Sequence, residues 1–421
     1  MDYAVYSKKV EVRRRPAVCV VGGGPAGIAA AVSAARRGAD VYLAEAQGCF
    51  GGAATNALVP AFMPFDNGVD FLAGGIGREV FDKCLKAGNV FEYGTLSILP
   101  ETLKKIYDGM AADAGFAFSF FTQLVDVEAS GGFVRRAYFA SKSGLFAVDA
   151  DIFIDATGDG DLCAWAGAPF EMGDERGVAM PATLCSTWHG IDWGGVGREP
   201  QNRMMDRAFA DGVFTQEDRH LPGMWKLADS LGGGNIGHCF NVDATSEASL
   251  TEAMLTGRRI IGEYKRYYRQ YLGGGFKDAR CIATGACLGV RESRRVTGDY
   301  VMTGGDYAAR ASFPDEIGRF SYPIDIHAMA PGDEAYGEYH SKITTMAYGR
   351  GESYGIPMRA LLPKGLENAY VAGRCISADR LMQSSVRVMP ACFITGQACG
   401  VSAALAVAGG ALPRQVETAR L

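Results

Sequence analysis

The sequence predicts an α/β protein in which a parallel sheet carries an inserted β-meander and is joined by a second unit of α+β type. Glycine-bearing stretches follow short apolar runs near the start, in the middle and near the end of the chain, as expected for loops at the ends of parallel strands. Short β-prone runs separated by Gly or Ser turns fill residues 116–148. Between 172 and 365 clean strand patterns become rarer, and Tyr, Arg, Met and Gly become more frequent. At 421 residues, the chain is long enough for two or three structural units.

The first glycine-bearing stretch, GGGPAG at 22–27, predicts a dinucleotide-binding strand, loop and helix. An apolar run over 17–21 leads into it, and a helix of small residues follows until Gly38. The first glycine makes the tight turn, the second lets the backbone approach a pyrophosphate at the positive helix end, and the third lets the helix pack closely on the strand. We therefore expect dinucleotide contacts from Gly22, Gly24, Pro25, Ala26 and Gly27.

A second expected strand, over 40–43, leads to Glu45, 18 residues after the glycine motif. An acidic side chain at this place can accept hydrogen bonds from a ribose, and the adjacent Ala46 joins the predicted binding residues. The stretch 232–237 has the same glycine spacing, but it follows a polar stretch of helical pattern over 226–230 and leads into no helix of small residues. We interpret this second glycine run as a loop.

The middle of the chain predicts an antiparallel meander placed between two parallel strands. A strand over 151–154 follows the meander, and Ala156, Thr157 and Gly158 turn its carboxyl end toward the bound dinucleotide. The β-prone runs of the meander cover 116–121, 124–128, 133–140 and 145–148.

The end of the chain predicts a strand over 369–372 and a buried helix over 391–408. The helix is apolar, but polar residues and glycines interrupt it, so we do not expect it to span a membrane. Pro390 suits the first turn of this helix, where its missing N–H removes nothing and the following amides stay free at the positive end of the dipole. Arg387 lies one turn upstream and can add a formal charge; the alternative is an ordinary helix start with a surface arginine.

Together these pieces resemble an FAD-dependent oxidoreductase of the group that shares the glutathione-reductase type of FAD domain and is related to the flavoprotein of fumarate reductase. The resemblance implies a Rossmann-like FAD-binding domain built from residues 1–171 and 366–421, and a substrate domain over 172–365. The matching stretches span the chain: GGGPAG at 22–27, Glu45, GGAAT at 51–55, DATGDGDL at 155–162, GVRESRR at 289–295, YPIDIH at 322–327 and residues 372–400.

The same resemblance implies further contacts to FAD. The backbone near Val125 would face the adenine, and the covalent-flavin histidine motif is absent, so noncovalent FAD is expected and fumarate is not the expected substrate. The remaining implied FAD residues are Gly52, Ala53, Thr55, Gly373, Arg374, Arg387, Met389 and Ala391.

Substrate chemistry is predicted from a small set of polar residues. A flavin accepts a hydride at N5 and develops negative charge at N1 and O2, which a helix N-terminus and Arg387 would stabilise. Helical spacing over 289–295 would put Arg291, Arg294 and Arg295 on one face, and strand spacing would split them. Grouped arginines suit an anionic ligand, whereas ion pairs with acids such as Glu292 are the structural alternative.

His327 is the predicted proton-transfer group, because it closes the YPIDIH stretch; the alternative is a hydrogen-bonded structural histidine. His189, His238 and His340 are weaker candidates. The resemblance also implies an arginine for a substrate carboxylate, a role that Arg380 fits loosely. The predicted catalytic set is His327, Arg294, Arg380 and Tyr322.

Composition limits the classes of molecule that the protein is expected to bind and the compartment in which it is expected to occur. The formal net charge of −5 argues against nucleic acid. The eleven cysteines include no CxxC pair, so we expect no metal site and free thiols in a reducing, cytoplasmic compartment. The Arg14-Arg15 pair precedes the first strand of the binding domain, so we expect no export. A small-molecule substrate is expected, no membrane partner is expected, and a homo-oligomer is left open.

Two functions follow. The first is an FAD-dependent dehydrogenase or reductase that acts on a small organic molecule by hydride transfer. The second is a flavoprotein whose FAD is structural or passes electrons to a protein partner. A flavin-dependent monooxygenase ranks lower, because the chain lacks a second nucleotide motif for NADPH. We prefer the first, because a long unit rich in Arg, Tyr and His has little purpose in a simple carrier.

Overall fold

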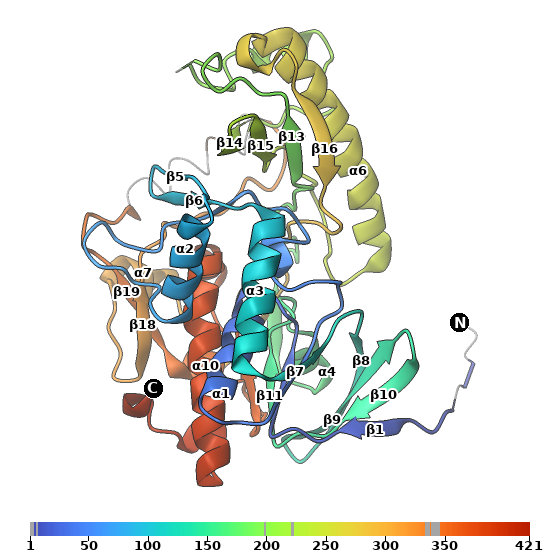
Figure 1. The fold of residues 1–421 in the computed structure, drawn as a ribbon, viewed down its shortest axis with the longest axis vertical. Coiled ribbons are helices and arrows are strands. Elements are labelled where there is room, and N and C mark those ends of the chain that lie inside the picture. Colours follow the sequence, from blue (N-terminus) through green and yellow to red (C-terminus); the bar gives the residue numbers. More distant parts are fainter. Residues whose placement is uncertain (1–3, 6, 198, 220–222, 333–336, 338–345) are drawn as a thin grey trace.

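The computed structural model describes residues 4–5, 7–197, 199–219, 223–332, 337 and 346–421, so His340 lies outside the described residues (Figure 1). The chain forms a parallel-sheet unit, a β-meander at its side, and a second sheet at the far end that is flanked by a long helix (Figure 1).

The parallel sheet has the order β20-β11-β2-β3-β7, and all its strand pairs are parallel. The predicted strands are therefore confirmed, with one correction. The run 116–121 was assigned to the meander, but Ala117–Ser119 pairs with β3 at the edge of the parallel sheet. The strands are β2 (Val18–Val21), β3 (Val41–Ala44), β7 (Ala117–Ser119), β11 (Ile152–Asp155) and β20 (Ala369–Val371).

The meander is a separate sheet with antiparallel hairpins. An N-terminal strand, β1, adds to it in parallel beside β10. Its strands are β1 (Glu11–Arg14), β8 (Gln123–Ser130), β9 (Phe133–Ser141) and β10 (Gly144–Val148).

Helix α1 (Pro25–Arg36) and helix α10 (Met389–Gly409) pack closely in the centre of the parallel-sheet unit (Figure 1). A Cβ atom on Gly396 would overlap the carbonyl of Ala26, and one on Gly400 would overlap the carbonyl of Ala30. From the first contact to the second, the residue number rises by four in both helices. The two helices therefore run parallel and begin at the same end. In the described residues, α10 is the one helix with the length and apolar composition of a membrane span, and 78% of that span is buried inside the molecule.

The second unit has its own hydrophobic core, formed by residues between Ala182 and Leu288. Its sheet has the order β14-β15-β13-β16, and helix α6 lies beside it (Figure 1). Two expectations for this region were wrong, because residues 224–228 and 231–234 form a β-hairpin in place of a helix and a loop. The elements are β13 (Ser186–His189), β14 (Met224–Ala228), β15 (Leu231–Gly234), α6 (Glu247–Arg266) and β16 (Arg280–Thr284).

Among the described residues, several between Met302 and Leu362 contribute to the same core as α1 and α10. The predicted substrate domain over 172–365 stays a prediction, and this packing supports a smaller second unit. The remaining helices and strands are β4 (Ala61–Phe62), α2 (Ile76–Lys86), β5 (Phe91–Glu92), β6 (Thr95–Ser97), α3 (Pro100–Ala114), α4 (Asp161–Trp165), β12 (Phe170–Met172), α5 (Met205–Ala210), β17 (Arg294–Val296), α7 (Gly304–Ala309), β18 (Glu316–Phe320), β19 (Tyr354–Pro357) and α9 (Arg380–Val386).

Candidate active site

The loops that follow the parallel strands meet at one edge of the sheet. The N–H of Gly22 donates to the carbonyl of Ala44 (2.8 Å), and that of Ala156 donates to the carbonyl of Val21 (2.9 Å). The N–H of Ala372 donates in turn to the carbonyl of Asp155 (2.9 Å). The glycine loops are therefore adjacent at the carboxyl edge, which is where open α/β sheets bind ligands.

The first of these loops has the geometry of a phosphate-binding turn. Gly22 has φ +96°, a conformation that favours glycine, and a Cβ on Gly27 would overlap the carbonyl of Gly22. Gly24 precedes α1 without a side-chain cap, and the first turn of the helix has no acidic residue. No atom lies within 4 Å of where a Cβ on Gly24 would stand. The positive end of α1 is thus open to an anion.

Glu45 follows β3 and is buried, with 7% of its surface exposed. One carboxylate oxygen accepts from the N–H of Gly23 (2.6 Å) and the other from that of Gln47 (2.7 Å). Burial raises the pKa of Glu45, and the bonds from Gln47 and Gly23 oppose that rise. A carboxylate has about four acceptor sites, so sites remain for the hydroxyls of a ribose.

The other predicted FAD residues surround this edge. Gly52 and Ala53 lie in a short 3₁₀ turn, where a Cβ on Gly52 would approach the Cα of Gly24 to 3.1 Å. Thr55 is buried and uses its hydroxyl within the same turn, as a donor to the carbonyl of Phe50 (2.6 Å). Ala46 is exposed beside Glu45.

Val125 lies at a β-bulge. Leu124 pairs with Phe139 and Asp126 with Tyr138, so the ladder of β8 and β9 skips Val125. Its side chain is 41% exposed. A skipped residue leaves backbone groups free for a ligand, as the predicted adenine contact requires.

The loop after β11 is held by the buried Asp155. Its Oδ1 accepts from the N–H and the hydroxyl of Thr157 (3.1 and 2.8 Å), and its Oδ2 accepts from the N–H of Cys163 (2.9 Å). Arg374, which follows Gly373, donates to the Asp159 carboxylate (2.6 Å) in the same loop. Gly158 lies directly against this guanidinium.

The predicted catalytic residue Arg294 belongs to this loop region. Its guanidinium donates to the carbonyl of Asp159 (3.1 Å) and to the carboxylate of Asp161 (2.7 Å). Burial, with Asp159 and Asp155 nearby, raises the pKa of Asp161 to about 6 in spite of Arg294. The hydrogen-bond partners of Arg294 thus differ from those of Arg380, Tyr322 and His327, the other predicted catalytic residues.

The start of α10 is also uncapped. Val388 precedes it without a side-chain cap, Met389 and Pro390 open it, and its first turn has no acidic residue. A Cβ on Gly373 would approach Ala26 in α1 to 3.1 Å and the Cys392 sulfur in α10 to 3.9 Å. Two open helix N-termini therefore lie side by side, one next to the glycine loop and one next to Ala391.

Helix α9 connects the two units. Asp379 caps it by accepting from the N–H of Met382 (2.7 Å). The buried Gln383 donates to the carbonyl of Arg291 (3.0 Å), and Ser384 accepts from the N–H of Asp325 (3.0 Å). A short helix thereby fixes the backbone of two charged segments.

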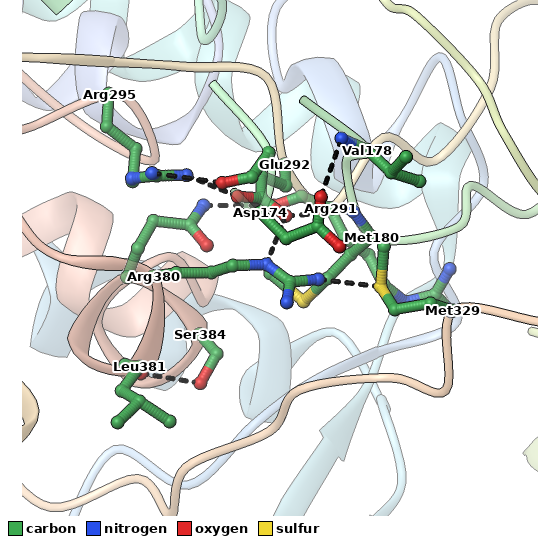
Figure 2. Close-up of polar contacts among 12 residues, drawn as sticks. Asp174, Val178, Met180, Arg291, Glu292, Arg295, Met329, Arg380, Leu381 and Ser384 are labelled. Carbon is green, nitrogen blue, oxygen red and sulfur yellow. Dashed lines mark hydrogen bonds and ion pairs between the residues drawn. The ribbon is translucent and has the colours of Figure 1, made fainter. Parts of the chain in front are cut away.

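The first charged segment is centred on Glu292, which is 1% exposed (Figure 2). Its carboxylate lies between Arg295 and Arg380, with Nε of Arg380 at 3.2 Å, and also accepts from the N–H of Met180 (2.8 Å) (Figure 2). Arg380 also contacts the sulfur of Met329 (Figure 2). The ion pair between an arginine of this stretch and Glu292, which was the structural alternative to an anionic ligand, is thus present for Arg295.

The three arginines of the GVRESRR stretch separate from one another. Arg294 and Arg295 are consecutive residues of β17, so they alternate as strand spacing predicts. Arg291 is buried, and its guanidinium donates to the carbonyl of Pro181 (2.8 Å) and the hydroxyl of Thr183 (2.8 Å) in the second unit. Burial, and then Arg387, lowers the pKa of Arg291 to about 10.

The second charged segment is centred on Asp325. Its carboxylate accepts from Arg387 (2.9 Å) and from the hydroxyl of Tyr322 (3.4 Å), and it faces Nε2 of His327 at 3.5 Å. Burial raises the pKa of Asp325, but the facing His327 and Arg387 more than offset this and hold it below its usual range. Tyr322, His327 and Arg387 thus lie around one carboxylate, and the catalytic roles of Tyr322 and His327 stay predictions.

His238 adds the second unit to this group. Its Nε2 lies 2.8 Å from Nδ1 of His327, and its Nδ1 lies 3.1 Å from the carboxylate of Asp218. Burial, and then the charge of Arg291, holds the pKa of His327 well below its ordinary value. Burial also lowers the pKa of His238 against the opposing charge of Asp218. We call Asp218, His238, His327 and Asp325 the imidazole cluster.

The sequence ranked His238 as a weak candidate and assigned no role to Asp218 or Asp325. Asp325 lies inside YPIDIH, so its position beside His327 was a usable signal. His238 lies 89 residues from His327, and its own segment has no motif that points to this contact.

The arrangement combines two features that suit redox chemistry on a bound dinucleotide. Open helix ends can hold phosphate and developing negative charge. Neutral buried imidazoles next to ionised carboxylates can take up and pass on a proton. In the described part of the chain, no group of three or more His, Cys, Asp or Glu residues could hold a metal ion.

Comparisons with known proteins bear on the family and the fold. The family model described as FAD dependent oxidoreductase matches residues 17–421. A solved geranylgeranyl bacteriochlorophyll reductase-like protein from Thermoplasma acidophilum is 13% identical, with a TM-score of 0.50 over 94% of this chain and 80% of that one. The p-nitrophenol 4-monooxygenase PnpA from Pseudomonas putida DLL-E4 is 11% identical, with a TM-score of 0.48 over 94% and 82%. At 13% identity the likeness to the first of these structures shows the fold alone. No curated protein matches the sequence.

Proposed function

The chain belongs to the FAD-dependent oxidoreductase family, and from this membership we propose that it oxidises or reduces a small organic molecule by hydride transfer to or from N5 of noncovalently bound FAD. FAD supplies the hydride chemistry when bound. The residues that would hold it are the glycine loop before α1, Glu45 at the ribose, the bulge at Val125 and the open start of α10.

The observation that supports the proposal is a group of charged side chains beside α9. They lie where the segments bonded to α9 contact the second unit. Arg387 lies between α9 and α10 and pairs with Asp325, which follows β18, whereas Arg291 reaches into the second unit. Titratable groups collected at such a junction are typical of a catalytic site. An electron carrier would have little use for them.

Each polar residue then has a stated task. His327 exchanges a proton with the substrate; its Nδ1 lies 2.8 Å from Nε2 of His238, and its Nε2 faces the Asp325 carboxylate at 3.5 Å. Arg387 holds Asp325 in place, and its positive charge favours negative charge near the start of α10. Glu292 fixes Arg380, which is one-fifth exposed and can meet an anionic group of the substrate.

The thiols support a cytoplasmic location. All eleven cysteines are free in the structure, and eight of them are buried, as expected in a reducing compartment.

Anaerobic bleaching of the flavin tests the proposal. The purified holoenzyme is mixed with panels of small organic acids, alcohols and amines, and after dithionite reduction with small electron acceptors, while the flavin absorbance is followed. A small molecule that reduces or reoxidises the flavin with no added protein supports the proposal. Redox exchange only with a protein partner would favour the electron-transfer alternative.

Once a substrate is found, His327→Ala should slow flavin reduction by about 10² to 10⁴ fold and leave the flavin spectrum intact. His189→Ala is the matched control, because His189 is exposed at the end of β13. Normal reduction kinetics in His327→Ala would remove His327 from the reaction.

A further inference from the structure

Arg291 differs from the neighbouring arginines in its lack of an acidic partner. Arg387 pairs with Asp325, and Arg380 pairs with Glu292. Among the described residues, no carboxylate is within ion-pair distance of the Arg291 guanidinium, although this side chain is only 6% exposed. Its pKa of about 10 keeps it cationic at neutral pH. A buried charge is unfavourable without a counter-ion, so the guanidinium calls for an anion that the described chain does not supply.

The position of Arg291 is fixed from two sides. Its carbonyl accepts from the side-chain amide of Gln383 in α9 (3.0 Å). Its Nη1 donates to the carbonyl of Pro181 and the hydroxyl of Thr183 (both 2.8 Å), and its Nη2 donates to Oδ1 of Asn235 (3.1 Å). A guanidinium has five N–H donors, so Nε and one N–H of Nη2 are left for another acceptor. Three neutral acceptors thus orient the guanidinium and leave its charge without a counter-ion.

Asn235 supplies a second donor beside the guanidinium. It follows β15 and is half-buried, and its Oδ1 also accepts from the thiol of Cys185 (3.7 Å). Its oxygen is therefore occupied, whereas its amino group has no hydrogen-bond partner in the part of the chain that the structure describes. A carboxylate has two oxygens, and adjacent N–H groups on Arg291 and Asn235 suit both of them.

The charges around Arg291 do not remove the need for an anion. The repulsion from Arg387 acts on Arg291 more strongly than the attraction from either Asp325 or Asp218. Arg291 in turn is the charge that acts most strongly on the buried His327, whose pKa it lowers. Interactions of this kind weaken with distance, so Arg291 and the predicted proton-transfer group belong to the same site.

We propose that Arg291 and Asn235 bind a carboxylate group of the substrate beside His327. The proposal rests on the proposed function, because it names the class of small organic molecule that FAD oxidises or reduces, an ionised carboxylic acid. The contact is separate from Arg380, whose charge Glu292 already offsets. The carboxylate takes the place of the missing counter-ion, so its binding should also stabilise the folded holoenzyme.

The first test compares carboxylates with neutral molecules of the same shape. Holoenzyme is unfolded by heat at constant ionic strength with acetate or acetamide, propionate or propionamide, and benzoate or benzamide. We expect a carboxylate to raise the unfolding temperature and its amide to leave it unchanged. Arg291→Met should weaken carboxylate binding about 30-fold or more, whereas Arg280→Met, at an exposed position of β16, should keep the shift. No shift with any of the three carboxylates, or an equal shift in Arg291→Met, would overturn the proposal.

The second test supplies the counter-ion within the chain. Asn235→Asp places a carboxylate where Oδ1 of Asn235 lies 3.1 Å from Nη2 of Arg291. We expect this variant to unfold at a higher temperature than the wild type without ligand, and to lose the shift with carboxylates. Asn235→Leu should lose the shift without this gain in stability. Wild-type carboxylate binding in Asn235→Asp would overturn the site, as would loss of the shift in Arg380→Gln together with its retention in Arg291→Met.

The two proposals fail in different ways. A holoenzyme that binds carboxylates through Arg291, but whose flavin no small molecule reduces or reoxidises, contradicts the proposed function and keeps the carboxylate site. A holoenzyme that exchanges electrons only with small molecules lacking a carboxylate keeps the proposed function and loses the site. The flavin spectrum of each variant shows whether FAD is still bound.

Discussion

Glu45 is the residue through which the FAD-binding edge can be tested most directly. Its two carboxylate oxygens order the glycine loop through Gly23 and the following turn through Gln47. Glu45→Ala should weaken FAD binding by about 1.5 to 3 kcal/mol, the range for a hydrogen bond to a charged group. Fluorescence titration of the apoprotein with FAD measures this loss. Glu92→Ala, at an exposed position of β5, is the control, and equal affinity in the two variants would contradict the ribose role.

Arg387 tests the charge at the start of α10. Its guanidinium pairs with Asp325 at 2.9 Å, so Arg387→Met removes a positive charge and also leaves a half-buried carboxylate without this partner. Both changes disfavour negative charge on the reduced flavin, and the reduction potential should fall. Spectroelectrochemical titration of wild type and variant gives the two potentials. Arg359→Met, which breaks a more exposed ion pair with Asp315, should leave the potential unchanged.

Single residues were predictable where a local pattern determines their position. Glu45 and the glycine loop lie close together in sequence, and the order of strand, turn and helix fixes their places. The partner of His327 was not predictable in this way. His238 and His327 meet across 89 residues and two units, and the contact depends on how the second unit packs.

At the scale of elements, the contact between α1 and α10 sets the geometry of the binding edge. Gly396→Ala would push a methyl group into the carbonyl of Ala26, and overpacking of this kind costs about 1 to 3 kcal/mol. We expect lower stability in urea and lower FAD occupancy, because the two helix starts move apart. Gly409→Ala has no atom within 4 Å and serves as the control. Equal loss in both variants would show that helix packing is not the cause.

Element prediction succeeded for the buried parallel strands and failed for the glycine-rich hairpin of the second unit. Apolar runs followed by glycine turns identify β2, β3, β11 and β20 from sequence. The glycines of β15 have another cause, since a Cβ on Gly233 would overlap the side chain of Pro60 and one on Gly232 that of Ile191. Close packing against distant residues leaves no local signal.

The ends of helix α6 also differ from those that the local sequence predicts. The capping-box pattern SLTE at 249–252 predicts a helix that starts near Ser249 and ends near Leu272. The helix is capped by Ser246, which accepts from the N–H of Ser249, and it passes into a π-helical turn at Tyr267. The aromatic packing of this turn, with Tyr267 and Tyr268 fully buried, belongs to the core of the second unit.

At the scale of the whole molecule, the two units share a buried polar junction, and this has a consequence for stability. Apolar packing forms separate cores, whereas His238, His327 and Arg291 carry polar contacts between α9, the Asp325 segment and the second unit. Buried neutral histidines bind protons less readily in the folded protein than in the unfolded chain. The junction should therefore be sensitive to acid.

The last prediction concerns this acid sensitivity. The pKa values of His238 and His327 are lowered by burial, so below about pH 6.5, the ordinary histidine value, the unfolded chain binds more protons and stability falls with pH. Each histidine should contribute about 1.4 kcal/mol per pH unit in that range. The pKa of Asp161 is raised to about 6, so this carboxyl group makes the folded protein more stable as the pH falls. The histidine contribution must therefore be measured as a difference between variants that all keep Asp161.

Urea unfolding of wild type and the double variant His238→Gln/His327→Gln, at several values between pH 7 and pH 5, isolates the histidine contribution. The wild type should lose stability more steeply toward low pH, because the variant has no imidazole to protonate in its unfolded chain at these positions. His189→Gln should keep the wild-type slope, since His189 is exposed. Parallel curves for wild type and double variant would mean that the two imidazoles bind protons as readily in the folded protein as in the unfolded chain, and the low pKa assigned to His327 would be wrong.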